Sequence, residues 1–229
     1  LRALVEEPAD GEIHTELMRL AARLGAPAWS RYADALAERA GSTFDAVVTT
    51  ELYSRLGLIA EEHLADLPRA ARAYTQAAEQ GGDSAPVLAA LDALYVKLGD
   101  PRALADVLER RLAVEVEGAV QADLLHRLGV LQVRSLGESG QGLASLRAAL
   151  ERVPEHAGAR QELESLLAEG VHFDDTFEAL EWLYRTLQAP EDLAALFARR
   201  VGRATFPRER VKARLDLARI YEDDVKDLA

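Results

Sequence analysis

Apolar residues recur at intervals of three and four along almost the whole chain, the spacing that places them on one face of a helix. Turn sequences such as "GGDSAP" at 81–86 and "GDP" at 99–101 interrupt this pattern. Their prolines fall just inside the next helix, where a missing N–H costs nothing. We predict helices at 12–24, 28–40, 44–64, 68–80, 85–98, 101–116, 119–136, 140–152, 156–169, 173–187, 190–204 and 207–226.

Twelve helices in 229 residues leave about nineteen residues for each helix with its turn, which is typical of stacked helix pairs. Abundant alanine and leucine favour helices, and scarce β-branched residues make an all-β fold improbable. We therefore expect an all-α protein, an α-solenoid in which antiparallel helix pairs form a right-handed superhelical arc. We expect residues 1–229 to be one domain and a fragment of a longer repeat protein.

One stretch of the chain occurs twice. Residues 95–113, "YVKLGDPRALADVLERRLA", resemble residues 184–202, "YRTLQAPEDLAALFARRVG", without gaps. Tyr95, Leu98, Pro101, Leu104, Ala105, Arg110 and Arg111 recur as Tyr184, Leu187, Pro190, Leu193, Ala194, Arg199 and Arg200, each 89 positions later. Repetition at a fixed offset is the sequence signature of repeat architectures.

Two further offsets connect other segments. "RLG" at 55–57 returns at 127–129, which is 72 positions later. Leu56, Ile59, Glu61 and Asp66 pair with Leu217, Ile220, Glu222 and Asp227 at an offset of 161. We infer a larger unit of about 162 residues, of which the chain holds about one and a half copies.

Residues 53–80, "YSRLGLIAEEHLADLPRAARAYTQAAEQ", resemble a tetratricopeptide repeat (TPR). The leading aromatic residue of that motif is matched by Tyr53, its Leu-Gly pair by Leu56 and Gly57, and its helix-B stripe by Ala70, Tyr74 and Ala77. Residues 91–108 fit the motif as well, and Leu128-Gly129 with Pro154 supplies a third copy. Individual copies depart from the motif in turn length, and 157–187 carries two helices of the first type in succession.

The TPR resemblance implies a ligand-binding concave surface lined by the first helix of each pair. By that resemblance the partner-binding residues are Trp182, Glu178, Arg134, His126, Val130, Leu58, Glu61, Ser54 and Arg19, with Gln161 and Ser165 beside them. TPR proteins that hold carboxylate termini of chaperones use lysine and asparagine there, and this chain has neither in those positions. Trp182 lies off the apolar stripe of its own helix, so it is either a binding anchor or packs on the next helix of the stack.

Charge narrows the class of partner. The formal net charge is −12, from 39 acidic and 27 basic residues, which opposes binding to a phosphate backbone. We therefore predict a protein or peptide partner and no nucleic acid. Arginine outnumbers lysine strongly, which hints at a bacterial source. The chain has no cysteine and no apolar run of about 20 residues, so we expect no membrane insertion and a cytoplasmic location, with the periplasm left open.

Motifs for catalysis or cofactor binding are missing from the sequence. The five histidines show no metal-ligand spacing, and "GESGQG" at 137–142 lacks the lysine of a phosphate loop and is interpreted as a turn. "HFDD" at 172–175 offers an imidazole and two carboxylates, but a simpler interpretation is that Asp174 or Asp175 caps the next helix. We predict no metal, no cofactor and no enzyme activity.

The function predicted on these grounds is a non-catalytic scaffold or adaptor that binds a partner peptide or helix in a concave groove. One alternative is a structural spacer or self-assembling segment that associates end to end through the apolar residues Leu1, Leu4, Ile220 and Val225. The other alternative is an enzyme on a helical-repeat frame. The arginine pairs 110–111 and 199–200 either complement the ends of their helices or form a repeated basic step for an acidic segment.

Overall fold

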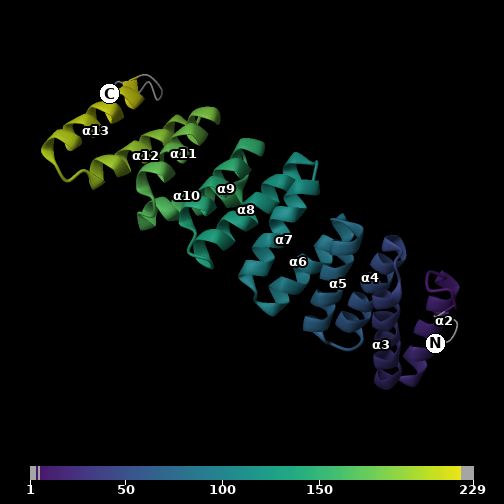
Figure 1. Cartoon of the computed structure of the whole chain (residues 1–229). Helices are drawn as coiled ribbons and strands as arrows, with labels where there is room; N and C mark the ends of the chain where they lie inside the picture. The colour runs from purple at the N-terminus through teal and green to yellow at the C-terminus, as the bar shows by residue number, and fades with distance from the viewer. Residues whose placement is uncertain (1–3, 5, 223–229) are drawn as a thin grey trace. The chain divides into compact units, whose positions relative to one another are not determined.

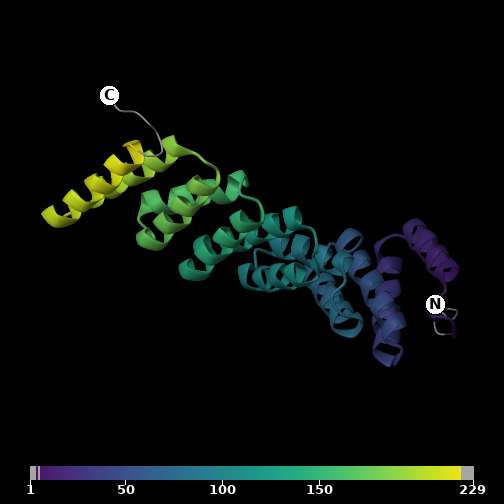
Figure 2. The same cartoon turned by 90° about the horizontal axis from the view of Figure 1, so that it is seen from above.

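The computed structural model describes residue 4 and residues 6–222, and every regular element among them is a helix (Figures 1 and 2). The chain divides into two compact units, Leu1–Glu115 and Val116–Ala229, and each is described by itself. The first unit holds α2 (Gly11–Leu24), α3 (Ala26–Ser42), α4 (Ala46–Glu62), α5 (Leu67–Gly81), α6 (Ala85–Leu98) and α7 (Pro101–Val114). The second unit holds α8 (Gly118–Arg134), α9 (Ser139–Arg152), α10 (Ala157–Glu169), α11 (Phe173–Thr186), α12 (Pro190–Arg203) and α13 (Pro207–Ile220).

All twelve predicted helices are present, and their boundaries agree within two residues except at the end of the last one. There the helix ends at Ile220, and residues 223–226 of the predicted range lie outside the described residues. Within each unit consecutive helices pack side by side in chain order (Figures 1 and 2). The prediction of an all-α protein of stacked helix pairs is confirmed. The single domain and the right-handed arc over 1–229 stay predictions.

The helices begin where the sequence supplies caps. The side chain of Asp45 accepts a hydrogen bond from the backbone N–H of Val47 at 2.9 Å, and that of Asp100 from Ala103 at 3.0 Å. Proline occupies the first turn of α3, α5, α6, α7, α12 and α13. Both devices satisfy or remove N–H groups that lack a partner inside the helix, so they set the boundaries locally.

In the first unit, α4 and α5 form a tight pair around Gly57. A Cβ atom added to Gly57 would lie 2.7 Å from the ring of Tyr74, so only glycine fits at this contact. Tyr74, Ala70 and Ala77 are all buried and belong to the same core cluster. The close approach expected from the small residues of the TPR-like stripe is therefore confirmed.

In the second unit, α8 and α9 repeat this contact 72 positions later. A Cβ atom on Gly129 would lie 2.8 Å from Leu146 and 2.9 Å from the carbonyl oxygen of Gly142. Leu146 stands where the first unit has Tyr74, and Gly142 stands where it has Ala70. The geometry of the pair is thus kept while its large side chain changes.

The turns of these two pairs also correspond. Ala65 has φ 52° and Gly137 has φ 70°, both in the left-handed region. The amide of Asp66 donates to the carbonyl of Ala60 at 2.8 Å, and that of Glu138 donates to Gln132 at 2.8 Å. The turn predicted for "GESGQG" is limited to Gly137 and Glu138, because α9 begins at Ser139 and contains the other four residues.

Two smaller expectations are wrong. Asp174 and Asp175 do not cap α11, because the helix begins at Phe173 and both carboxylates lie inside its first turn, where they face the positive end of the helix dipole. Leu4 and Ile220, expected as open apolar ends, are buried at 1% and 5% exposure. Leu1 and Val225 lie outside the described residues.

No helix in the described part of the chain is long and apolar enough to cross a membrane.

Candidate functional site

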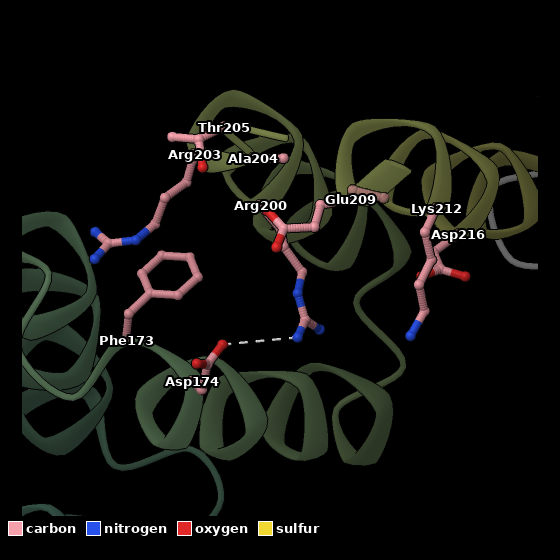
Figure 3. A pocket seen from close by; sticks show the side chains of 10 residues that line it. Phe173, Asp174, Arg200, Arg203, Ala204, Thr205, Glu209, Lys212 and Asp216 are labelled. Carbon is pink, nitrogen blue, oxygen red and sulfur yellow. Dashed lines mark ion pairs between the residues drawn. The ribbon is translucent and has the colours of Figure 1, made fainter. Parts of the chain in front are cut away.

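A cleft of about 680 Å³ opens in the second unit where α11, α12 and α13 meet (Figure 3). The start of α11 contributes Phe173 and Asp174, and the end of α12 contributes Arg200 and Arg203. The connection to α13 and the near face of that helix complete the lining with Ala204, Thr205, Glu209, Lys212, Ala213 and Asp216. Residues that are up to 43 positions apart in the sequence therefore face one space.

Two guanidinium groups of the cleft region lie on aromatic rings. The Cζ atom of Arg203 is 4.5 Å from the ring centre of Phe173, and that of Arg200 is 4.5 Å from the ring centre of Phe177. Phe177 is fully buried, so its ring is a fixed support. Stacking holds each guanidinium by its face and leaves its N–H edge available to an acceptor.

Gly170 gives Arg203 the room for this position. The glycine ends α10 in the left-handed conformation with φ 75°. A Cβ atom at Gly170 would lie 2.8 Å from Nη1 of Arg203, so a larger residue would displace the guanidinium. One residue therefore serves both the helix end and the cleft.

The charges of the cleft are mixed and only partly paired. Asp174 lies 3.7 Å from Arg200, the ion pair drawn in Figure 3. Asp216 faces Arg219 of its own helix at 3.8 Å. Lys212 and Glu209 have no ion-pair partner among the described residues. An open cleft with stacked arginines, a lysine and carboxylates suits a peptide that carries charges of both signs.

Charged and hydroxyl-bearing side chains define the chemistry of the cleft. Among the described residues no group of three or more histidine, aspartate or glutamate side chains could hold a metal ion. The polar groups that line the cleft are the carboxylates of Asp174, Glu209 and Asp216, two guanidinium groups, the Lys212 ammonium group and the Thr205 hydroxyl. What it offers is hydrogen-bond donors and acceptors on a fixed frame.

The predicted partner-binding residues of the first unit lie on α2 and α4 and are held within the unit. Arg19 pairs with Glu16 at 2.6 Å, and Glu61 accepts from Lys97 at 2.7 Å. The hydroxyl of Ser54 donates to the carbonyl of Thr50, one turn earlier in its own helix. Leu58 is 37% exposed. The bond from Lys97 shows that α4 and α6 share a face, as the first helices of successive pairs should.

In the second unit, Arg134 is the predicted residue with the most contacts. Its Nε donates to Glu162 at 2.7 Å, and its Nη1 and Nη2 donate to Glu169 at 2.7 and 2.8 Å. Ser165 completes the cluster by accepting from Arg134 and donating to Glu169. These bonds raise the pKa of Arg134 and lower that of Glu169. A ligand at Arg134 would have to replace contacts that already link α8 to α10.

His126 lies beside His156, with the two ring centres 5.0 Å apart. Burial and the neighbouring imidazole lower the pKa of His126. His156 is the N-cap of α10, since its Nδ1 accepts from the amide of Ala159 at 3.1 Å, and its Nε2 lies 3.0 Å from Asp123. Val130, one turn after His126, is partly buried against the core. This part of α8 thus supports the α8–α10 contact.

Trp182 and Glu178 lie apart from the other predicted residues of the second unit. Both are on α11, which packs mainly against α10 and α12, whereas His126, Val130 and Arg134 are on α8, which packs mainly against α9 and also contacts α10. Trp182 is partly buried against the core, in line with the packing interpretation, while Glu178 is exposed. Helix α10, which contacts both α8 and α11, therefore lies between these two subsets.

Sequence reasoning missed the cleft, although some of its residues had been noticed. Arg200 belongs to the repeated arginine pair, and Asp174 belongs to "HFDD". Arg203, Lys212 and Glu209 carried no signal, because exposed charges on helices are common. Extending the 89-position comparison beyond the repeated segments would have found Phe173 and Arg203, which stand where Ser84 and Val114 stand 89 positions earlier.

Comparisons with known proteins add likenesses of the fold alone. No family model matches the chain, and no curated protein matches it. A crystal structure of the MamA protein is 18% identical with a TM-score of 0.46, covering 79% of this chain and 96% of that one. YrrB, described as a TPR protein with an unusual peptide-binding site, is 19% identical with a TM-score of 0.44, covering 84% and 95%. A tetratricopeptide repeat protein from Parabacteroides merdae is 17% identical with a TM-score of 0.49, covering 93% and 81%.

The TM-scores lie below 0.5, so the description of the fold rests on the helix pairs of this chain and on their contacts at Gly57 and Gly129. At the level of the helix pair, the resemblance predicted from residues 53–80 is confirmed.

Proposed function

We propose that this protein is a non-catalytic scaffold for protein–protein interaction, and that the cleft between α11, α12 and α13 holds a charged peptide segment of its partner. The observation that carries the proposal is the placement of Arg203 on Phe173 at the edge of an open cleft. A guanidinium fixed in this way presents its donors without losing side-chain freedom on binding, which favours affinity.

The identity of the lining residues supports a role beyond packing. Of the cleft residues, only Arg200 repeats a residue found 89 positions earlier, where Arg111 stands. Phe173, Asp174 and Arg203 replace Ser84, Ala85 and Val114. If the segment served stacking alone, the shared packing positions would be sufficient.

The residues predicted from the TPR resemblance remain a second candidate surface. That surface includes Arg134, Leu58 and Trp182. We keep it as a proposal because Leu58 and parts of α8 are exposed to solvent. The charged side chains Arg134 and Glu61 are already paired inside the protein, so a ligand there gains less than at the cleft.

Peptide display on the full chain tests the proposal. A phage library of random 16-residue peptides is selected on the full chain, and the dissociation constants of enriched peptides are measured by fluorescence anisotropy. We expect carboxylate-bearing peptides that lose at least about tenfold in affinity for Arg203→Ala and for Lys212→Ala, since each change removes a charge-assisted hydrogen bond.

Matched variants separate the two surfaces. Arg134→Ala and Trp182→Ala should leave the affinity of these peptides within about twofold, because neither side chain lines the cleft. Loss of binding in these variants alone would move the site to the predicted surface. A selection without enriched peptides would contradict the groove and favour the structural spacer.

A further inference from the structure

The segment beside the cleft is basic, although the chain as a whole is acidic. Residues 199–219 contain eight arginine and lysine residues and two acidic ones, a formal net charge of +6 in a chain of net charge −12. The matching stretch 89 positions earlier, residues 110–130, has three basic and three acidic residues and no net charge. Because both copies pack into the stack of helices, the added cations are not needed for packing.

Three of these cations form a stripe along α13. Arg208, Lys212 and Arg219 are spaced by four and seven positions, which places them on the same face of a helix. All three are exposed, and Lys212 also lines the cleft, so the stripe borders the cleft. Figure 3 shows the side chain of Lys212 extending in the same direction as that of Arg200. These three residues are called the basic stripe below.

The face of the basic stripe is also exposed in an earlier copy of the helix, where a further helix follows. Arg208 and Arg219 correspond to Val47 and Leu58 of α4 at an offset of 161. Val47 is 77% exposed and Leu58 is 37% exposed, although α5 packs against α4. The stripe therefore lies on a face that the next helix of a stack leaves open.

The cations of the basic stripe are poorly paired. Elsewhere in the second unit, ion pairs of 3.0 Å or less hold an arginine on each of α8, α9 and α11. Within the described residues, Arg208 and Lys212 have no ion-pair partner, and Arg219 approaches Asp216 only to 3.8 Å. Exposed cations without a close internal partner are available to the carboxylates of another molecule.

We propose that the basic stripe docks an acidic segment of the partner, next to the part of the partner that enters the cleft. This segment belongs to the partner of the proposed function, so the inference rests on that function in this respect. Arg208 and Arg219 are eleven positions apart. On a helix this separation is about 17 Å, the length of about five residues of an extended peptide.

The geometry of an extended peptide specifies the segment further. Side chains at every second position of such a peptide point to the same side. Asp or Glu at alternate positions would therefore place its carboxylates along the stripe, where each can form a charge-assisted hydrogen bond with a guanidinium or ammonium group.

The charge of the rest of the second unit favours a short acidic segment over a nucleic acid. Outside residues 199–219, this unit has 18 acidic residues and seven basic ones. A long polyanion would meet this negative surface and be repelled, whereas a short segment contacts the stripe alone.

The probe for the test is a labelled ten-residue peptide of alternating Glu and Ser, and the matched control peptide has Gln in place of Glu. Fluorescence anisotropy with the full chain should show saturable binding of the Glu peptide at about 0.05 M salt. The Gln peptide should bind at least about tenfold more weakly, because it lacks the carboxylates. Binding of the Glu peptide should weaken as salt is added, since exposed charges are screened.

Charge reversals on α13 locate the binding. Arg208→Glu and Arg219→Glu should each weaken binding of the Glu peptide at least about fivefold, since each replaces an attraction by a repulsion. Arg214→Glu is the matched control, because Arg214 is exposed on the same helix but lies off the stripe and does not line the cleft. It should change the affinity by less than about twofold at about 0.15 M salt. Circular dichroism confirms that the three variants fold.

The inference and the proposed function can fail separately. Peptides selected on the full chain that lose affinity for Arg203→Ala, but not for Arg208→Glu or Arg219→Glu, would support the cleft and contradict the stripe. A Glu peptide that loses affinity for the two stripe variants, but not for Arg203→Ala, would support the stripe and contradict the cleft.

Three further results would overturn the docking of an acidic segment. The first is equal binding of the Glu and Gln peptides, and the second is an equal loss for Arg208→Glu and Arg214→Glu. The third is tighter binding of a ten-nucleotide single-stranded DNA that is lost in the same stripe variants, which would assign the stripe to nucleic acid.

Discussion

The segments 95–113 and 184–202 have matching sequences, but different contacts stabilise the joint of each segment, which is the place where its two helices meet. In the first segment, Arg110 donates to Asp83 with its Nε at 3.0 Å and Arg111 pairs with the buried Asp92. In the second segment, Arg200 lies on the ring of Phe177 and approaches Asp174 only to 3.7 Å. In the first unit, both arginines of the pair form ion pairs at the joint between the helices. In the second unit, Arg200 of the corresponding pair lines the cleft.

The comparison separates packing positions from functional ones. Pro101 and Pro190 each begin the second helix of their joint, and Ala105 and Ala194 are both buried. The cleft, in contrast, lies mostly outside segment 184–202, and Arg200 alone among its lining residues matches the residue 89 positions earlier. In a repeat protein, shared residues maintain the stack, so differences between copies are the place to look for binding.

The largest expected effect concerns the ion pair that only the first segment has. Asp92→Ala should lower the free energy of unfolding by about 2 kcal/mol, because it leaves the half-buried guanidinium of Arg111 without this partner. Glu181→Ala, at the corresponding position, should cost about 0.5 kcal/mol or less, since Glu181 pairs with Arg185 along its own exposed helix face.

The chain offers a separate probe for each unit. It has two tryptophans, Trp29 in the first unit and Trp182 in the second. Urea unfolding followed by Trp29 in a Trp182→Phe background therefore reports on Asp92→Ala, and Trp182 in a Trp29→Phe background reports on Glu181→Ala. Equal losses in the two units would contradict the distinction between the joints.

The tyrosines of the repeated segments give the next effect. The hydroxyl of Tyr184 donates to Glu164 at 2.7 Å, whereas that of Tyr95 lies 3.5 Å from Thr75, which stands 89 positions before Glu164. Tyr184→Phe should cost about 1 kcal/mol or slightly more, and Tyr95→Phe about 0.3 kcal/mol. The two losses of stability are measured as shifts of the urea midpoint with the same tryptophan probes. A larger loss for Tyr95→Phe than for Tyr184→Phe would contradict this prediction.

A similar comparison applies to the turns of the tight pairs. Ala65 adopts a left-handed conformation that Gly137 adopts without strain. Ala65→Gly should therefore leave the first unit as stable or stabilise it by up to about 1 kcal/mol, and Gly137→Ala should destabilise the second unit by about 1 kcal/mol. Thermal unfolding of both variants gives the direction of each change in stability. Changes in the same direction would contradict the equivalence of the two turns.

The smallest predicted effect is a dependence of the first unit on pH. His14 is fully buried between the hydroxyl of Tyr32 and the carbonyl of Pro8, and burial lowers the pKa of His14 below 6.5. The unfolded chain then binds a proton at higher pH than the folded one. The contribution of His14 to the free energy of unfolding is complete above pH 6.5 and is lost as the pH falls through the pKa of His14 in the folded state.

Replacing the histidine tests this dependence. Urea midpoints from pH 7.5 to pH 5, followed by Trp29, should fall less steeply for His14→Gln than for the parent chain. His172→Gln lies in the second unit, so it should leave the slope reported by Trp29 of the first unit unchanged. Equal slopes for all three proteins would remove His14 as the cause.

The sequence predicted the helices because their determinants are local. Asp45 and Asp100 cap the helices that follow, prolines mark first turns, and the stripe at Gly57 and Ala70 forms one tight pair. Repetition at 72 positions then extended that contact to Gly129. Periodicity and caps depend on residues only a few positions apart, so each helix can be predicted from its own stretch of sequence.

The site was less accessible to the same reasoning. The cleft joins Phe173, Arg203 and Lys212 from three helices, and their meeting depends on how α11, α12 and α13 pack. Helical periodicity says which face of a helix is buried but not which neighbour covers it. For that reason Trp182 was grouped with residues of α8, although its helix packs mainly on α10 and α12, and the many internal partners of Arg134 were not foreseen.

The most direct test of the account exchanges three cleft residues for the residues found 89 positions earlier in the chain. A variant with Phe173→Ser, Asp174→Ala and Arg203→Val carries at these positions the residues found 89 positions earlier. Affinity for peptides selected on the parent chain should fall at least about tenfold, while the helical circular dichroism stays the same. Unchanged affinity in this folded variant would contradict the proposal that the cleft binds the partner.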